Sequence, residues 1–135
     1  MIINCTNLPW PLNNRFISLL QHELSAAGVI GGNNGAVINF RDPEYDFHSG
    51  GYHPVEIAVN SDGCIQYITD FALYGMPPQV ELAKEIDFDF SLQLFQHMGR
   101  EYPIRNGKTL FKVWEENFIS YYLSNAYSVE VSTWL

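Results

Sequence analysis

Apolar and polar residues alternate most clearly between residues 53 and 73, and this pattern predicts a β-hairpin. Two runs, residues 55–60 and 65–74, have the period of two that is typical of strands with one buried face. Residues 61–63 separate the runs. Gly63, at the third position, suits the left-handed conformation that a three-residue hairpin loop needs there.

The three-residue turn also predicts how the two strands pair. Three pairs follow from it: Val59 with Ile65, Ile57 with Tyr67, and Val55 with Thr69. In this register one face of the hairpin is apolar. The other face carries Glu56 and Asp70 as diagonal neighbours, roughly 7–8 Å apart. A slip of one residue would mix the two faces, so the pattern and the turn support each other.

Two segments have apolar residues at spacings of three and four, which predicts amphipathic helices. The first covers residues 12–27, where Asn13 or Asn14 can cap the start and Gly28 suits the left-handed position after the end. The second covers residues 107–123, and its apolar stripe consists of Leu110, Trp114, Phe118 and Tyr121.

Shorter segments have weaker patterns. Alternation predicts strands over residues 36–41 and 127–133. A short helix is predicted from Pro77-Pro78 through Lys84, and another over residues 91–98 that ends at Gly99. Residues 86–90 alternate like a strand, but Asp89 could instead cap the following helix, so their structure stays open.

These elements predict one α+β domain over residues 1–135. We expect a mostly antiparallel sheet of about four strands, with the two main helices packed on one face. The composition agrees with a folded chain, because 47% of the residues are hydrophobic and only 16% are charged.

The net charge of −8 narrows the range of partners. Binding to nucleic acid is not expected, because affinity for phosphate backbones depends on Lys and Arg. Anionic membrane surfaces are disfavoured for the same reason. A protein partner remains possible, and a basic one would suit an acidic surface.

Cysteine usage and the chain start predict a cytoplasmic protein. Cys5 and Cys64 form no CxxC or Cys/His spacing, so neither a disulfide scaffold nor a metal site is expected. Residues 1–5 lack the basic and apolar regions of a secretory signal, and no apolar run approaches membrane-spanning length. No cofactor is expected either.

The candidate chemistry gathers at the open end of the hairpin. His53, Glu56 and Asp70 are the candidate catalytic residues, with His48 in the preceding loop. A histidine beside paired carboxylates could serve general acid–base chemistry or hold a divalent metal. A polar sheet face also carries such residues simply because it meets water, and this second interpretation is favoured.

Aromatic residues near this cluster suggest a binding surface. The candidate binding residues are Tyr45, His48, Tyr52 and Tyr74. Acidic residues alternate with aromatic ones over residues 42–47 and 81–90, which could form an interface for a basic partner. Phe88 and Phe90 are instead expected to point inward, because residues of the same parity face one side of a strand.

Four segments resemble one bacterial family, known as domain of unknown function 2787. They are Gly50–Ile57, Tyr67–Phe71, Glu85–Phe90 and Gly99–Ile104, and the resemblance runs from about residue 36 to the C-terminus. The resemblance implies a bacterial protein of one domain. The family has no established activity, so it implies nothing about mechanism.

The function therefore stays unknown from sequence alone, with two hypotheses. The leading one is a non-enzymatic interaction or accessory protein of the bacterial cytoplasm, with an acidic, aromatic-rich surface. It follows from the charge, the 15% aromatic content and the lack of a catalytic motif. The alternative is a small enzyme or metal-dependent hydrolase that uses the His/carboxylate cluster of the hairpin.

Overall fold

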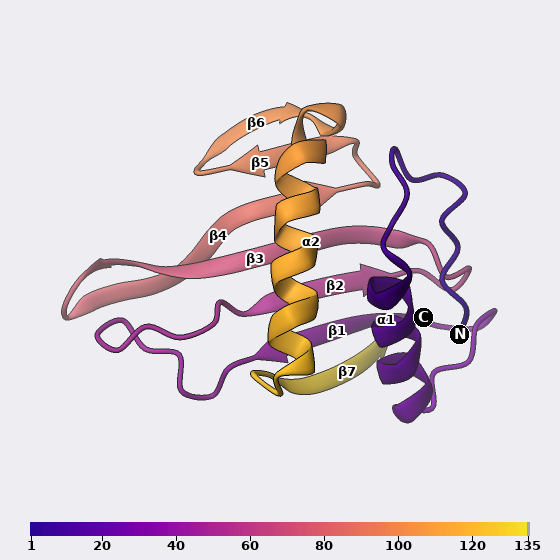
Figure 1. The fold of residues 1–135 in the computed structure, drawn as a ribbon, viewed down its shortest axis with the longest axis horizontal. Coiled ribbons are helices and arrows are strands. Elements are labelled where there is room, and N and C mark those ends of the chain that lie inside the picture. Colours follow the sequence, from indigo (N-terminus) through magenta and orange to yellow (C-terminus); the bar gives the residue numbers. More distant parts are fainter. Residues whose placement is uncertain (135) are drawn as a thin grey trace.

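The computed structural model describes residues 1–134, which form one seven-stranded sheet and two α-helices (Figure 1). Neighbouring strands are antiparallel, in the order β6-β5-β4-β3-β2-β1-β7. The α+β class is confirmed, but the expected number of about four strands is wrong. The strands are β1 (Gly35–Arg41), β2 (Val55–Val59), β3 (Ile65–Met76), β4 (Gln79–Asp89), β5 (Leu94–His97), β6 (Arg100–Pro103) and β7 (Ser128–Trp134).

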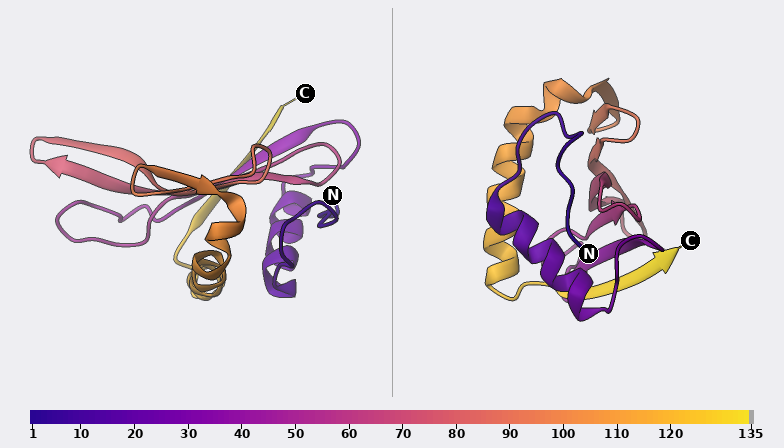
Figure 2. Two further views of the ribbon diagram at one scale, coloured as in Figure 1. Left: turned by 90° about the horizontal axis from the view of Figure 1, so that it is seen from above. Right: turned by 90° about the vertical axis from the view of Figure 1, so that its right-hand side faces the viewer.

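Both predicted main helices are present, as α1 (Asn14–Ala26) and α2 (Lys108–Leu123). Asn13 caps α1 as expected, since its side chain accepts a hydrogen bond from the backbone N–H of Arg15, and Gly28 has a φ of +75° just beyond the end. Figure 2 shows both helices on the same face of the sheet. No helix within residues 1–134 is long and apolar enough to span a membrane.

The segment after β3 forms a strand where the sequence predicted a short helix. Pro77 and Pro78 make the turn between β3 and β4, and pairing starts next to them with Met76 opposite Gln79. The reason lies in β3, which is twelve residues long and needs a partner for its backbone groups. Residues 86–89, whose structure the sequence left open, belong to β4.

Gly99 belongs to a hairpin turn and not to a helix end. Met98 and Gly99 have φ values of +52° and +81° and connect β5 to β6, with His97 opposite Arg100. Positive φ at both central residues is the requirement of a type I′ turn. A glycine that ends a helix and a glycine in such a turn look alike in sequence, so the predicted helix over residues 91–98 is wrong.

The hairpin of β2 and β3 is present, but most of its predicted register is wrong. The pair next to the turn, Val59 with Ile65, is as predicted. The next β2 residue, Ala58, pairs with Tyr67, so Gln66 has no partner in β2 and forms a β-bulge. Beyond this bulge each pair is displaced by one residue: Ile57 faces Ile68 and not Tyr67, and Val55 faces Asp70 and not Thr69.

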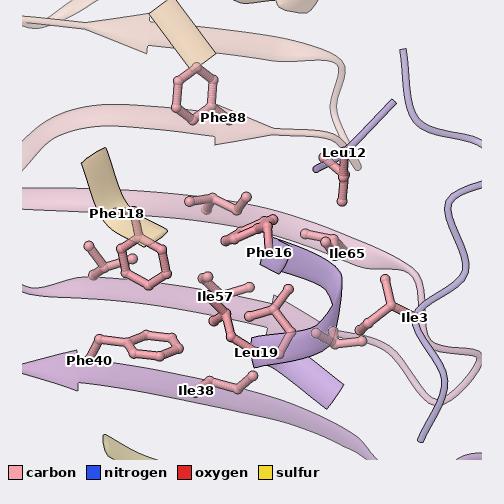
Figure 3. Packing of buried hydrophobic residues seen from close by; sticks show 14 of the residues in the cluster. Ile3, Leu12, Phe16, Leu19, Ile38, Phe40, Ile57, Ile65, Phe88 and Phe118 are labelled. Atoms are coloured by element: carbon pink, nitrogen blue, oxygen red, sulfur yellow. The ribbon is translucent and has the colours of Figure 1, made fainter. Parts of the chain in front are cut away.

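Aromatic side chains fill the core between the helices and the sheet (Figure 3). Phe118 of α2 contacts Phe40 of β1 edge to face and stacks on Trp114, with ring centroids 4.9 Å apart in both pairs. Phe88 points inward as expected, with 1% of its surface exposed. Much of the aromatic content therefore serves packing.

Gly63→Ala is expected to destabilise the protein more than Gly28→Ala does. The two glycines have φ values of +81° and +75°, so alanine costs roughly 1–2 kcal/mol of backbone strain at either position. Only at Gly63 would the new Cβ overlap the carbonyl oxygen of Ile2. Chemical denaturation followed by circular dichroism measures both free energies of unfolding. Equal losses would contradict this close approach of the N-terminal segment to the hairpin turn.

Candidate functional site

A cleft of about 350 Å³ lies between α2 and the strands β3 and β4. This size is in the range of sites that bind small molecules. One histidine and two carboxylates line it, and these are its ionisable side chains other than tyrosines: His53 from the segment before β2, Asp70 from β3, and Glu85 from β4. The cleft therefore joins residues that are far apart in the chain.

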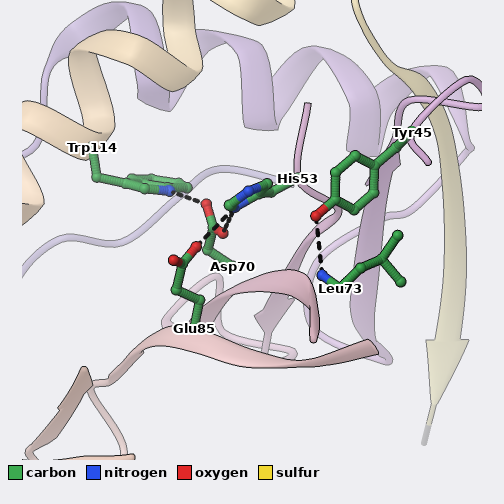
Figure 4. A network of polar contacts seen from close by, with 6 residues as sticks. All are labelled: Tyr45, His53, Asp70, Leu73, Glu85 and Trp114. Atoms are coloured by element: carbon green, nitrogen blue, oxygen red, sulfur yellow. Dashed lines mark hydrogen bonds and ion pairs between the residues drawn. The ribbon is translucent and has the colours of Figure 1, made fainter. Parts of the chain in front are cut away.

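The histidine and the two carboxylates meet at one imidazole nitrogen (Figure 4). His53 Nδ1 lies 2.8 Å from Asp70 Oδ1 and 3.0 Å from Glu85 Oε2. Asp70 Oδ2 accepts a 3.0 Å hydrogen bond from the indole N–H of Trp114. Because Nδ1 carries at most one hydrogen, it cannot give each carboxylate its own linear hydrogen bond.

Two β-bulges turn both carboxylates toward α2. The bulge at Gln66 shifts the alternation of β3, so Asp70 lies opposite the buried Val55 on the helix-covered face. In β4, Ile86 pairs with Asp70 and Lys84 with Phe71, which leaves Glu85 as an extra residue. As a result Glu85 and Ile86, although adjacent in sequence, both line the cleft.

The two carboxylates differ in their exposure. The Asp70 side chain is 12% exposed and is held by Trp114, whereas the Glu85 side chain is 29% exposed. The hydrogen bond with Asp70, together with the negative charges of Asp70 and Glu85, raises the pKa of His53, although burial acts in the opposite direction. Of the two carboxylates, that of Glu85 is therefore the more accessible to a ligand in the cleft.

Tyrosine rings form a second wall of the cleft. Tyr52 lies next to Tyr121, with ring centroids 4.6 Å apart, and 6.3 Å from Tyr127. Burial, followed by the charge of Asp70, raises the pKa of Tyr127, so its hydroxyl stays protonated at neutral pH. The cleft thus has two carboxylates on one side and an aromatic wall that bears hydroxyl groups on another.

A family model described as protein of unknown function (DUF2787) matches residues 14–132. The chain belongs to the DUF2787 family. The resemblance seen in the sequence is thereby confirmed, and the match begins before residue 36, where that resemblance started. No curated protein sequence matches this DUF2787 chain.

Two solved structures of Vibrio cholerae proteins are similar to this DUF2787 protein. The hypothetical protein VC0508, from the VSP-II pathogenicity island, is 33% identical, with a TM-score of 0.81 over 96% of this chain and 98% of its own. The conserved hypothetical protein VC1805, from pathogenicity island VPI-2, is 37% identical, with a TM-score of 0.76 over 90% and 95%. VC1805 is described as sharing structural homology with the human P32 protein. Both relatives are bacterial and neither has an assigned function.

The structure separates the three candidate catalytic residues of this DUF2787 protein. His53 and Asp70 are in contact. Glu56 lies opposite Thr69 on the other face of the sheet, where its carboxylate accepts a hydrogen bond from the Tyr67 hydroxyl. The prediction that Glu56 and Asp70 share a face is wrong because the bulge at Gln66 reverses the alternation between them.

The four candidate binding residues lie at different distances from the cleft. Tyr52 lines it, and the Tyr45 ring is 5.5 Å from the His53 ring, while the Tyr45 hydroxyl accepts a hydrogen bond from the backbone N–H of Leu73. Tyr74 is exposed and does not line the cleft, but some loss of solvent contact and the charges of Glu85 and Asp70 raise its pKa. His48 is exposed in the loop and does not line the cleft.

Sequence reasoning missed Glu85, Trp114, Tyr121 and Tyr127 as members of the site. One signal could have pointed to Glu85. Continued alternation from Phe88 and Ile86 would place an apolar residue at position 84, and a lysine stands there. That interruption marks the bulge, whereas the residues from α2 and the segment after it carry no comparable signal.

Asp70→Asn is expected to lower the pKa of His53, because it removes the charge and the hydrogen bond that raise it. Glu56→Gln, on the opposite face, should leave that pKa unchanged. NMR titration of the imidazole resonances measures the effect, with His53→Gln to assign them. Glu85→Gln, at a more exposed position, should lower the pKa less. An equal pKa in the wild type and in both Asp70→Asn and Glu85→Gln would contradict the contact geometry.

The raised pKa of His53 also predicts how the free energy of unfolding changes with pH. The folded protein binds this proton more tightly than the unfolded chain does, so the stabilisation is complete below the unfolded pKa of about 6.5. It is lost as the pH rises through the folded pKa. The difference in unfolding free energy between wild type and His53→Gln should therefore shrink as the pH rises from about 5.5, one unit below the unfolded pKa, through the raised folded pKa.

Proposed function

We propose that this protein is a non-enzymatic binding module that holds a positively charged ligand in the cleft below α2. One observation carries the proposal: Asp70 and Glu85 converge on a single imidazole nitrogen of His53. Two carboxylates can carry two negative charges, whereas one imidazolium carries a single positive charge. A cation supplied by a ligand would remove this imbalance.

The surroundings of the carboxylates support a ligand rather than a plain surface contact. The cleft is large enough for a small molecule or for one side chain of a partner. The faces of Tyr52, Tyr121 and Tyr127 offer an environment that favours cations over anions. The net charge of −8 would also speed the approach of a basic partner.

A role as an accessory protein of the bacterial cytoplasm remains part of this proposal. Family membership and the Vibrio cholerae relatives support a bacterial setting. A basic partner could present a lysine or arginine side chain to the cleft. In that case Tyr74, an exposed aromatic residue that the charges of Glu85 and Asp70 reach, would add contact area.

A small enzyme is the second candidate, because His53 and Asp70 form a histidine–carboxylate pair. Such a pair orients the imidazole and stabilises its protonated form. Since Asp70 engages Nδ1, Nε2 is the nitrogen that could exchange a proton with a substrate. Turnover of ester or phosphoester test substrates that is lost in His53→Gln would favour this candidate over the binding module.

Cations are expected to stabilise the wild-type protein against thermal unfolding, and to stabilise Glu85→Gln less. Suitable probes are the amides of acetyl-lysine and acetyl-arginine together with Zn²⁺ and Mn²⁺, with the amide of acetyl-glutamate as the anionic comparison. A ligand at 100 times its dissociation constant adds about 2.7 kcal/mol. Differential scanning fluorimetry measures the shift in melting temperature.

Glu56→Gln is the matched control for this experiment, because it removes the same charge from the other face of the sheet. It should respond to every probe as the wild type does. The proposal fails if no cation stabilises the wild type, or if Glu56→Gln loses as much stabilisation as Glu85→Gln.

A further inference from the structure

We infer that His53, Asp70 and Glu85 form a binding site for a divalent transition-metal ion of the Zn²⁺ or Mn²⁺ class. The inference rests on the proposed function, since it identifies the positive charge in the cleft as a metal ion. It also goes further, because a basic side chain or an organic amine would fill the same cleft without using the imidazole as a ligand.

The spacing of the donor atoms suits a metal ion. His53 Nδ1, Asp70 and Glu85 each offer one ligand atom, and these atoms all lie within 4.8 Å of one another. Two of the separations are 2.8 and 3.0 Å. Ligands at about 2.0–2.2 Å from one ion are roughly 3–3.5 Å apart, so only small side-chain movements would complete the site.

The types of ligand narrow the choice of ion. Imidazole nitrogen with carboxylate oxygen suits Zn²⁺ and Mn²⁺, whereas Ca²⁺ and Mg²⁺ favour sites made of oxygen alone. Three protein ligands leave at least one coordination position for water or for a ligand in the cleft. This arrangement is typical of sites that act on or bind another molecule, because structural zinc sites use four protein ligands.

Trp114 gives the site the outer support that metal ligands have. Its indole N–H donates to Asp70 Oδ2, which leaves Oδ1 directed at His53 and available to an ion. Trp114 is itself fixed by stacking on Phe118. Hydrogen bonds of this kind orient metal ligands, and their loss typically lowers metal affinity 10–100-fold.

The backbone also places the ligands on paired strands. Asp70 lies opposite Val55 on one side and Ile86 on the other, within the sheet. Glu85 is the bulged residue of β4, and bulges next to functional sites commonly redirect one side chain. A site on such elements needs little reorganisation to bind an ion.

Isothermal titration of the chelator-treated full chain with Zn²⁺, and separately with Mn²⁺, tests the inference. One ion per chain is expected, with at least tenfold weaker binding in Glu85→Gln and in His53→Ala. Trp114→Phe should weaken binding about 10–100-fold while all three ligands remain. Bound Co²⁺ should give a visible absorption spectrum that His53→Ala alters.

Two comparisons make the result decisive. Glu56→Gln removes one negative charge outside the site and should bind the ion as the wild type does. Glu85 is partly exposed, so Glu85→Gln should fold even if a change at the more buried Asp70 does not, and circular dichroism without metal checks this. Equal losses in Glu56→Gln and Glu85→Gln would show binding to the acidic surface in general and overturn the inference.

The same titrations separate this inference from the proposed function. If acetyl-lysine amide binds in a Glu85-dependent way and neither Zn²⁺ nor Mn²⁺ does, the cleft holds an organic cation and the metal inference is wrong. Removal of the imidazole would then leave cation binding unchanged or stronger. If no cation of either kind binds, both proposals fail.

Discussion

Two single-residue bulges, at Gln66 and Glu85, determine which side chains of the central strands face α2. A strand alternates strictly, so one inserted residue exchanges the two faces for everything beyond it. The first bulge moves Asp70 to the helix-covered face, and the second adds Glu85 to that face beside Ile86. Without both bulges, the cleft would keep its aromatic wall but would lose the carboxylate pair that distinguishes it.

The sequence could predict the elements whose signals are local. The helix α1 has both a side-chain cap at Asn13 and a glycine after its end, and three residues ending at Gly63 predict the hairpin turn. The sequence does not predict the first part of β4, through Lys84, or the β5–β6 hairpin, because their local signals fit two structures. Pro77-Pro78 can open a helix or form a turn, and Gly99 can end a helix or occupy a type I′ turn. Only pairing with distant strands selects between these alternatives.

The site was predictable to a smaller degree. The sequence indicates His53 and Asp70 as candidates because both lie at the open end of the hairpin, His53 just before β2 and Asp70 within β3. Glu56 was placed wrongly because a bulge adds one residue without any distinctive composition. Trp114 and Tyr127 come from the last quarter of the chain, and their approach to Asp70 follows from the packing of α2 on the sheet. The spacing of apolar and polar residues within one segment cannot predict such a contact between distant segments.

Packing and charge act against each other around Asp70. Trp114 links the core to the charged cluster. It packs against Phe118 and Phe16 in the core, and its indole N–H donates a hydrogen bond to the Asp70 carboxylate. The core thereby holds Asp70 close to Glu85, although two carboxylates near one imidazole repel each other. By contrast, the buried Glu115 lies beside the ammonium of Lys112 and accepts a hydrogen bond from the backbone N–H of Asn13. A cation that binds only the folded cleft would remove the repulsion and stabilise the whole fold. The proposed cation binding would thus account for two neighbouring carboxylates that share one imidazole.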